Sequence, residues 1–396
     1  DHLALRDAVQ RFCTGEYPAE HRGNPETAAQ GRQRWQAMAE LGLLGLPFAA
    51  DLGGSDQGAV ELMLGAQELG RALGGGAWLV HTVMAGQLLA RLGKLSQQQQ
   101  WLPALASGER QAALALQEQG ARYDWQRVRT RASSSARGYL LDGRKTLVLH
   151  GDTADLLLVV ARTSGADDDR QGLSVFALDA NTPGVQVQGF DTLDGRRAAH
   201  ISLNQVELGA GQLLGEPGQA ADAIEAVLDA ANATLCAEAA GAVEALLVHS
   251  ADHLRTRKQF GAPLAKFQVL QHRMADMAIA LEQLKSMACA AAAAVQGDDA
   301  AQRRRVVSAA KAFASQQGRQ IGLAAIQLHG GMGMTDECRV GHYSKRLMVI
   351  GQLFGDAAWH LQTPGPDRVV GHGNCLGFVF CSGGQGHRAD NTQGDL

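Results

Sequence analysis

Four long segments in the second half of the chain carry apolar residues at the spacing of an α-helix. Only short connections separate them, and they span residues 221–253, 268–296, 299–329 and 336–361. Long helices joined by short connections pack antiparallel against one another. The sequence therefore predicts a four-helix bundle over residues 219–362. Small residues crowd the stretch 230–245, so we expect helices to approach closely there.

The first part of the chain divides into two regions with different periods. Residues 3–110 keep a helical spacing, with helices expected at 61–73 and 78–92, and predict a helical domain over residues 1–111. A β domain is predicted over residues 112–218, as a sandwich or partly open barrel, from short apolar or alternating runs at 112–116, 138–141, 146–149, 156–161, 173–178 and 200–203.

The predicted fold is thus α+β and mainly α, with a helical, a β and a bundle domain in that order. Asp142-Gly143 between two of the short runs predicts a hairpin turn. Residues 363–396 are rich in glycine and polar side chains, and no role is assigned to them.

Charge and composition exclude several classes of partner. The net charge is −4 and no stripe of lysine and arginine forms, which argues against nucleic acid. The one basic run, 303–305, is predicted to be a solvated helix face. No apolar run reaches the roughly 18 residues of a membrane span, so no membrane contact is expected. No Gly-x-Gly-x-x-Gly follows a strand, which argues against a Rossmann domain.

The six cysteines are scattered and none has the spacing of a zinc site. We therefore expect reduced thiols and no metal, in a reducing compartment such as the cytoplasm.

One loop in the bundle has the chemistry of a nucleotide site. Gly261 and Pro263 break the helical period, and the broken stretch carries one cation and two amide groups, on Arg257, Gln259 and Gln268. Phe260 adds an aromatic face. A guanidinium and amides can bind phosphate and an aromatic ring can stack on a base, so the loop predicts a cofactor that bears phosphate.

This loop resembles the Arg-x-Gln-Phe-Gly signature of the acyl-CoA dehydrogenases, with Phe267-Gln268 and Ala275-Asp276-Met277 following it. A second run of that family is similar to residues 327–335, Gln-Leu-His-Gly-Gly-Met-Gly-Met-Thr. The resemblance extends over residues 1–362. It implies FAD as cofactor, with its ADP half gripped partly from a neighbouring subunit by Arg257, Gln259, Phe260, Gln268, Gln327, Gly330 and Gly331.

The resemblance also implies a reaction, the α,β-desaturation of an acyl-CoA thioester. A carboxylate takes the α-proton while hydride leaves for the flavin, and the electrons pass to an acceptor such as electron-transfer flavoprotein. The family's usual glutamate, in a Tyr-Glu-Gly-Thr type sequence, corresponds here to Gly355. An alternative position used by some relatives corresponds to Ala231, beside Asn232.

Three acids lie near these two positions. Asp356 is the candidate base, but an acid one residue out of register is rotated by about 100° on a helix, so capping the next helix is the favoured role. Asp229 and Glu238 are expected to be ordinary charges on a helix surface.

The pocket for the flavin ring also departs from the family pattern. Gln117 stands in the stretch that matches a Thr-Glu-Pro sequence and can still donate one hydrogen bond to the ring. Leu147 begins the stretch that should cover the ring, and Arg122 and Tyr123 occupy the region of an expected serine. This pattern resembles the small subunits of heteromeric acyl-CoA dehydrogenases of the pimeloyl-CoA dehydrogenase type.

Three hypotheses follow. The first is an FAD-binding subunit that acts in a hetero-oligomer with a catalytically complete acyl-CoA dehydrogenase partner. The second is a self-sufficient homo-oligomer, a dimer or tetramer, that uses Asp356 as base. The third is a non-catalytic acyl-CoA-binding or structural module.

Overall fold

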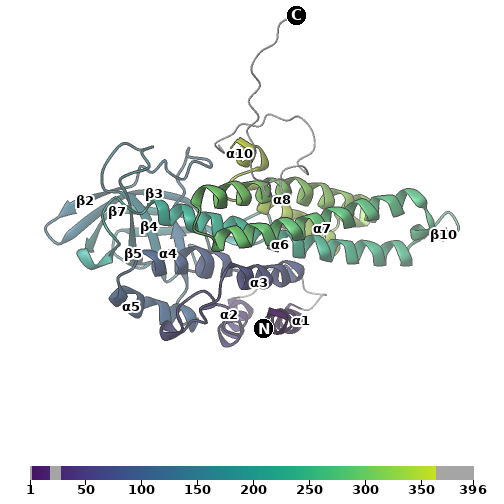
Figure 1. The fold of residues 1–396 in the computed structure, drawn as a ribbon, viewed down its shortest axis with the longest axis horizontal. Helices are drawn as coiled ribbons and strands as arrows, with labels where there is room; N and C mark the ends of the chain where they lie inside the picture. The colour runs from purple at the N-terminus through teal and green to yellow at the C-terminus, as the bar shows by residue number, and fades with distance from the viewer. Residues whose placement is uncertain (1, 18–27, 363–396) are drawn as a thin grey trace, which may run out of the picture. The chain divides into compact units, whose positions relative to one another are not determined.

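The computed structural model describes residues 2–17 and 28–362, which form three successive domains (Figure 1). The predicted fold class is confirmed: helices come first, a β domain follows and a helical bundle completes the described chain. The predictions for residues 363–396, including the thiols Cys375 and Cys381, lie outside the described residues. Cys236, Cys289 and Cys338 are free thiols.

Helices make up the first domain, and one of them has an unusual turn. The segment expected at 78–92 is helical, but its first half is a π-helix, a form that often occurs at functional sites. The domain consists of α1 (His2–Glu16), α2 (Ala28–Glu40), the short η2 (Ala50–Leu52), α3 (Ala59–Ala72), the π-helix η3 (Leu79–Gly86), α4 (Gln87–Leu92) and α5 (Leu95–Ala106).

A buried histidine ties the π-helix to the β domain. His81 Nδ1 accepts the backbone N–H of Ala112 at 3.0 Å, and Nε2 lies 3.1 Å from the Leu105 carbonyl. Burial lowers the pKa of His81 to about 4, so the ring is neutral and Nε2–H is the donor to Leu105.

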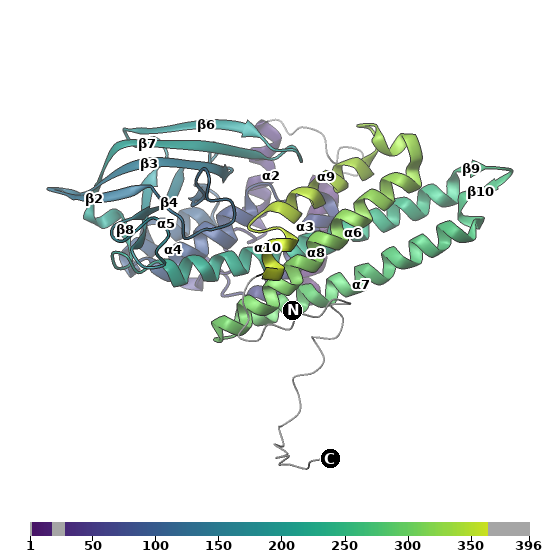
Figure 2. The same ribbon diagram turned by 90° about the horizontal axis from the view of Figure 1, so that it is seen from above.

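The β domain is one eight-stranded sheet that folds into two layers. Its order is β6-β7-β3-β2-β4-β5-β8, with β1 beside β4, and β2 meets β4 at the single pair Arg131 and Arg162. Apolar side chains of both layers form a shared core, as in a partly open barrel. Figure 2 shows β6, β7, β3 and β2 side by side in this sheet. The strands are β1 (Ala112–Ala115), β2 (Arg131–Ser135), β3 (Gly138–Leu149), β4 (Leu156–Arg162), β5 (Leu173–Asp179), β6 (Val185–Asp191), β7 (Arg197–Gly209) and β8 (Leu213–Leu214).

The hairpin turn predicted at Asp142-Gly143 is wrong. β3 runs through both residues, because β7 pairs with the strand on either side of them and the register shifts there as in a β-bulge. Gly143 has φ +155°, and a Cβ at that position would lie 2.4 Å from Thr130 Oγ1. The Asp-Gly pair therefore lies at a bulge within one long strand, and it is not a turn between two short strands.

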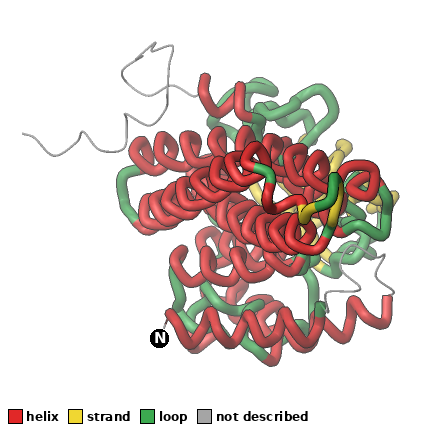
Figure 3. Tube along the Cα trace, turned by 90° about the vertical axis from the view of Figure 1, so that its right-hand side faces the viewer, coloured by secondary structure: helices red, strands yellow, loops and turns green. Residues whose placement is uncertain are grey.

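The first three helices of the bundle lie close to their predicted bounds, and the fourth differs from its prediction. Figure 3 views it from the end that carries the small β9–β10 hairpin. The last predicted helix, 336–361, is broken into two by the segment 353–356. The elements are α6 (Ala221–Thr256), β9 (Lys258–Gln259), β10 (Ala262–Pro263), η5 (Leu264–Lys266), α7 (Gln268–Gln296), α8 (Ala300–His329), η6 (Gly330–Met334), α9 (Arg339–Gln352) and α10 (Ala357–Gln362).

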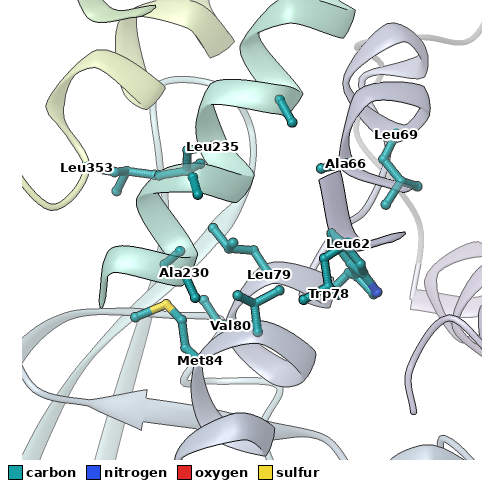
Figure 4. Packing of buried hydrophobic residues seen from close by; sticks show 14 of the residues in the cluster. Leu62, Ala66, Leu69, Trp78, Leu79, Val80, Met84, Ala230, Leu235 and Leu353 are labelled. Carbon is teal, nitrogen blue, oxygen red and sulfur yellow. The ribbon is translucent and has the colours of Figure 1, made fainter. Parts of the chain in front are cut away.

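Two of these helices, α6 and α7, are long and apolar enough to cross a membrane by length and composition alone. The apolar window of α6 is 83% buried inside the protein, as expected of a core helix. Figure 4 shows Ala230 of α6 near Val80 and Met84 of η3, and Leu235 of α6 beside Leu353. In α7 only 33% of the window is buried, so this helix presents apolar surface outward.

The close approach predicted for 230–245 occurs between α6 and α3. A Cβ added at Gly241 would lie 1.8 Å from the Gln67 carbonyl oxygen, and one at Gly70 would lie 2.1 Å from the Glu238 carbonyl oxygen. Both obstacles are backbone atoms, so the helices must move apart to accept even a methyl group.

We expect Gly241→Ala to lower the free energy of unfolding by ~1–3 kcal/mol, the usual cost of overpacking a tight core. Chemical denaturation of the variant measures this. Gly211→Ala is the matched control, because a Cβ there meets no atom within 4 Å. Equal stability of the two variants would contradict the tight contact between α3 and α6.

Candidate functional site

The three domains meet at one cleft, which encloses about 940 Å³ including space open to solvent. Its apolar wall comes from η3, β1, α6 and the loop after α9, with Val80, Met84, Leu114, Leu116, Leu228 and Phe354. Its polar groups include Gln117, Asp229, Asn232, Arg304, Ser308 and His360. The cleft can take a long molecule that is mainly apolar and carries a few polar groups.

Gly355, the position matched to the usual glutamate, has no room for a side chain. It has φ +126°, and an added Cβ would lie 2.6 Å from both His360 Nε2 and Trp359 Cε3. Lys311 of α8 fixes the loop that contains Gly355, because its Nζ donates hydrogen bonds to the Leu353 and Gly355 carbonyls at 2.9 Å each. Burial lowers the pKa of Lys311 to about 8. Trp359 and His360 thus occupy the space that a carboxylate at Gly355 would need.

Asp356 caps the helix that follows it. Its Oδ1 accepts the backbone N–H of Trp359 at 2.8 Å, in the first turn of α10. The described residues that line the cleft do not include Asp356. This geometry matches the favoured capping role, and the role of Asp356 as base stays a prediction.

The expectation that Asp229 is a surface charge is wrong. Asp229 lines the cleft and is only 7% exposed, and its Oδ2 accepts from Arg303 Nε at 2.9 Å. Burial raises the pKa of this carboxyl. The prediction that residues 303–305 form a solvated helix face is also wrong, because Arg303 pairs with Asp229 and Arg304 pairs with Glu225 at the cleft.

Glu238 is likewise buried, at 6% exposure, and belongs to an ion cluster that joins the domains. Its two oxygens accept from Arg346 of α9 at 2.7 Å each, and Arg196 of the β domain binds Oε1 at the same distance. Asp194 balances the charge by accepting from Arg346 at 2.8 Å. Burial alone would raise the pKa of Glu238, but the two guanidinium groups outweigh it and hold the pKa below its usual value.

Two polar side chains on the β-domain wall of the cleft, Gln117 and Glu118, already have partners. Gln117 lines the cleft, and its Nε2 already donates to the Arg122 carbonyl at 2.8 Å. Glu118 is held by Lys145 Nζ at 2.7 Å and Thr130 Oγ1 at 2.6 Å. Leu147 adds an apolar contact from a bulged part of β3.

Aromatic contacts connect the two sides of the cleft near Gly355. Tyr123 Oη donates to Gln352 Oε1 at 2.8 Å, and the Tyr123 and Trp359 rings lie 6.3 Å apart, edge to face. These contacts join the loop after β1 to the end of the bundle. Tyr123 and Trp359 both line the cleft.

The two motifs that were predicted to bind a nucleotide lie near the opposite end of α6. The rings of His253 in α6 and His329 in α8 stack with centroids 4.3 Å apart, which brings the ends of these two helices together. The predicted ADP-binding side chains are exposed to solvent, and Phe260 is 91% exposed. We call the group Arg257, Gln259, Phe260, Gln268, Gln327, Gly330 and Gly331 the clamp.

The clamp and the cleft of one chain are far apart. Asn232 lines the cleft and Arg257 ends α6, and the stretch of helix between them is ~37 Å long at 1.5 Å per residue. That exceeds the length of a dinucleotide. The structure therefore brings the clamp residues together but leaves Gln117 in another part of the molecule.

The sequence patterns missed several residues around the cleft. Lys311 is fully buried, and its position among the apolar and small residues 309–314 was a usable signal of burial. Trp359 and His360 gave no such signal, because their contacts with Tyr123 and Ser308 join distant parts of the chain.

Comparisons with known proteins identify the family of each domain. Models of the N-terminal, middle and C-terminal domains of acyl-CoA dehydrogenase match residues 1–109, 113–207 and 221–363. Probable acyl-CoA dehydrogenase YngJ of Bacillus subtilis (strain 168) is 30% identical over 355 residues, which are 88% of this chain and 93% of that protein.

Solved structures show the same fold. A chain of the ChsE4–ChsE5 complex from Mycobacterium tuberculosis is 27% identical with a TM-score of 0.81, over 92% of this chain and 98% of that one. Butyryl-CoA dehydrogenase from Megasphaera elsdenii is 23% identical with a TM-score of 0.82, over 91% and 96%.

Proposed function

The chain belongs to the acyl-CoA dehydrogenase family, and from this premise we propose that it is an FAD-binding subunit that desaturates an acyl-CoA together with a catalytically complete partner. The family consists of flavin-dependent oxidoreductases. One observation carries the proposal: the predicted clamp residues lie exposed near one end of α6, while Trp359 and His360 fill the space beside Gly355, the position matched to the glutamate.

The clamp residues fit the ADP half of FAD. Arg257 would hold the diphosphate, Gln259, Gln268 and Gln327 would donate or accept hydrogen bonds, and Phe260 would cover an apolar face. Among the described residues no ion pair neutralises Arg257. When bound, FAD supplies the acceptor for the hydride that leaves the β-carbon. Because the clamp and the cleft are so far apart, the bound FAD would extend to a neighbouring chain.

A partner of a different sequence is supported by what the chain lacks and by what it resembles. No acid among the described residues reaches the cleft from Gly355 or Ala231. The solved relative ChsE4–ChsE5 is a complex of two proteins. We propose a similar hetero-oligomer here, of the type with a small subunit that lacks the glutamate. Electrons would leave through an electron-transfer flavoprotein, and the assembly would work in the cytoplasm.

Assays of the full chain with and without its partner test this proposal. We expect the chain alone to give no turnover of a panel of acyl-CoAs with an artificial electron acceptor, and turnover to appear when the partner is added. Turnover by the chain alone would exclude the need for a partner and favour the self-sufficient homo-oligomer.

Asp356 variants separate capping from catalysis. We expect Asp356→Ala to lower the free energy of unfolding by ~1 kcal/mol, because the Trp359 N–H loses its acceptor. Asp356→Asn is the matched control, because asparagine caps a helix about as well as aspartate but cannot take a proton at neutral pH. Stability and turnover of the assembly are measured for both. Normal stability with lost turnover in Asp356→Asn would make Asp356 the base.

A further inference from the structure

One edge of the β domain is long and unprotected. β6 ends the strand order, with β7 on its inner side, and Figure 2 shows it as the outermost strand of its layer. β8, at the other end of that order, has only two residues. Proteins usually shorten such edges or place lysine or proline in them, because exposed backbone groups recruit further strands. β6 has seven residues, and none of them is lysine or proline.

The register shows which residues of β6 turn their backbone groups outward. In an antiparallel pair, every second residue exchanges its backbone hydrogen bonds with the neighbouring strand. Two bonds fix this alternation between β6 and β7: the Thr192 N–H donates to the Arg196 carbonyl, and the Asn204 N–H donates to the Gly184 carbonyl. The even-numbered residues of β6 therefore bond to β7, and the odd-numbered residues direct their N–H and C=O groups away from the sheet.

Three exposed residues carry these outward groups, Val187, Gly189 and Asp191. Within the part of the chain that the structure describes, no hydrogen bond occupies their backbone N–H and C=O groups. A row of alternating donors and acceptors two residues apart matches the backbone of another extended strand. The edge of β6 thus has the chemistry to add a strand.

We propose that β6 pairs antiparallel with β6 of a second copy of this chain, about a twofold axis at Gln188. In this register Val187 lies opposite Gly189 of the second copy, so outward backbone groups meet outward backbone groups on both strands. The one charged residue, Asp191, lies opposite Val185, so no like charges oppose each other. The strand is therefore complementary to itself. β6 contributes no residue to the cleft or to the clamp, so this interface is independent of the proposed function.

The length of the strand sets the strength of the pairing. A stable interface buries about 1,200–2,000 Å² in total, and a single pair of seven-residue strands buries less. We therefore expect a reversible association that increases with chain concentration.

Disulfide trapping in the full chain tests both the pairing and its register. Gln188 and its counterpart form a pair without backbone hydrogen bonds, in which side chains lie closest. We expect Gln188→Cys, treated with oxidised glutathione, to form a covalent dimer on a non-reducing gel. Gln186→Cys is the matched control on the same face of β6, because its two copies would lie four residues apart along the strands, about 13 Å. The control should give at least about tenfold less dimer, since the exposed Cys289 contributes the same background to both variants.

A second change in the Gln188→Cys chain tests the backbone bonds. Val187→Pro removes an outward N–H without touching the bonds to β7, and should lower the dimer yield at least about fivefold. Val187→Thr keeps the N–H and should leave the yield unchanged. Far-UV circular dichroism reports the fold, and Val187→Lys replaces the proline variant if that one does not fold. Equal cross-linking of the two cysteine variants, no covalent dimer at high concentration, or a full yield with proline or lysine at position 187 would overturn the inference.

Discussion

Arg257→Ala should strip FAD from the assembled protein. The side chain is exposed in the single chain and ends α6 at the junction with the β9–β10 hairpin, where it can meet the diphosphate of a cofactor held by a neighbour. A hydrogen bond between charged groups contributes ~1.5–3 kcal/mol, so affinity for FAD should fall by at least about tenfold per site. Flavin absorbance per protein chain after gel filtration measures the loss.

Arg255→Ala is the control for a general loss of positive charge. Arg255 lies two residues earlier, is 71% exposed at its side chain and pairs only weakly with Asp252, at 3.5 Å. We expect this variant to retain its flavin. Full retention of flavin by Arg257→Ala would show that the clamp does not hold the cofactor. Equal loss of flavin in both variants would show that Arg257 acts only through its positive charge, by long-range electrostatics.

Glu238→Ala should destabilise the chain more than any other single change considered. The variant leaves the buried Arg346 and the partly buried Arg196 beside one remaining carboxylate, that of Asp194. Removing one partner of a buried ion pair costs ~3–5 kcal/mol, because the other charge stays out of water without compensation. Denaturation by urea, followed by far-UV circular dichroism, measures the change.

Two further variants define the cause of that loss. Glu282→Ala removes an exposed carboxylate on α7 and should cost less than ~0.5 kcal/mol. The double variant Glu238→Leu with Arg346→Met removes the strongest pair together, and should be less destabilised than Glu238→Ala. A Glu238→Ala protein as stable as Glu282→Ala would show that the cluster does not hold the domains together.

The sequence predicted the long helices well because their periodicity extends over many turns. α7 was predicted at its observed bounds, and α6 and α8 nearly so. The prediction at Asp142-Gly143 was wrong because a local turn signal contains no information on whether β7 pairs with the residues before and after the Asp-Gly pair. The break at 353–356 was missed for a similar reason, since carbonyls in that loop bond to Lys311 from another helix.

The candidate site was predictable where function lies in a contiguous motif. Arg257 and Gln327 belong to such motifs, and the structure brings both motifs to one end of the bundle. The burial of Asp229 and Glu238 was not predictable, because the arginines that neutralise them lie 74 and 108 residues away in the sequence. Burial of a charge depends on such distant partners, which no local pattern records.

The most direct test is the structure of the FAD-loaded assembly at a resolution that shows the diphosphate. We expect the guanidinium of Arg257 to contact the diphosphate of an FAD whose flavin ring lies in a different chain. An FAD bound from end to end within one chain, with Arg257 surrounded by bulk water, would contradict a cofactor shared between subunits.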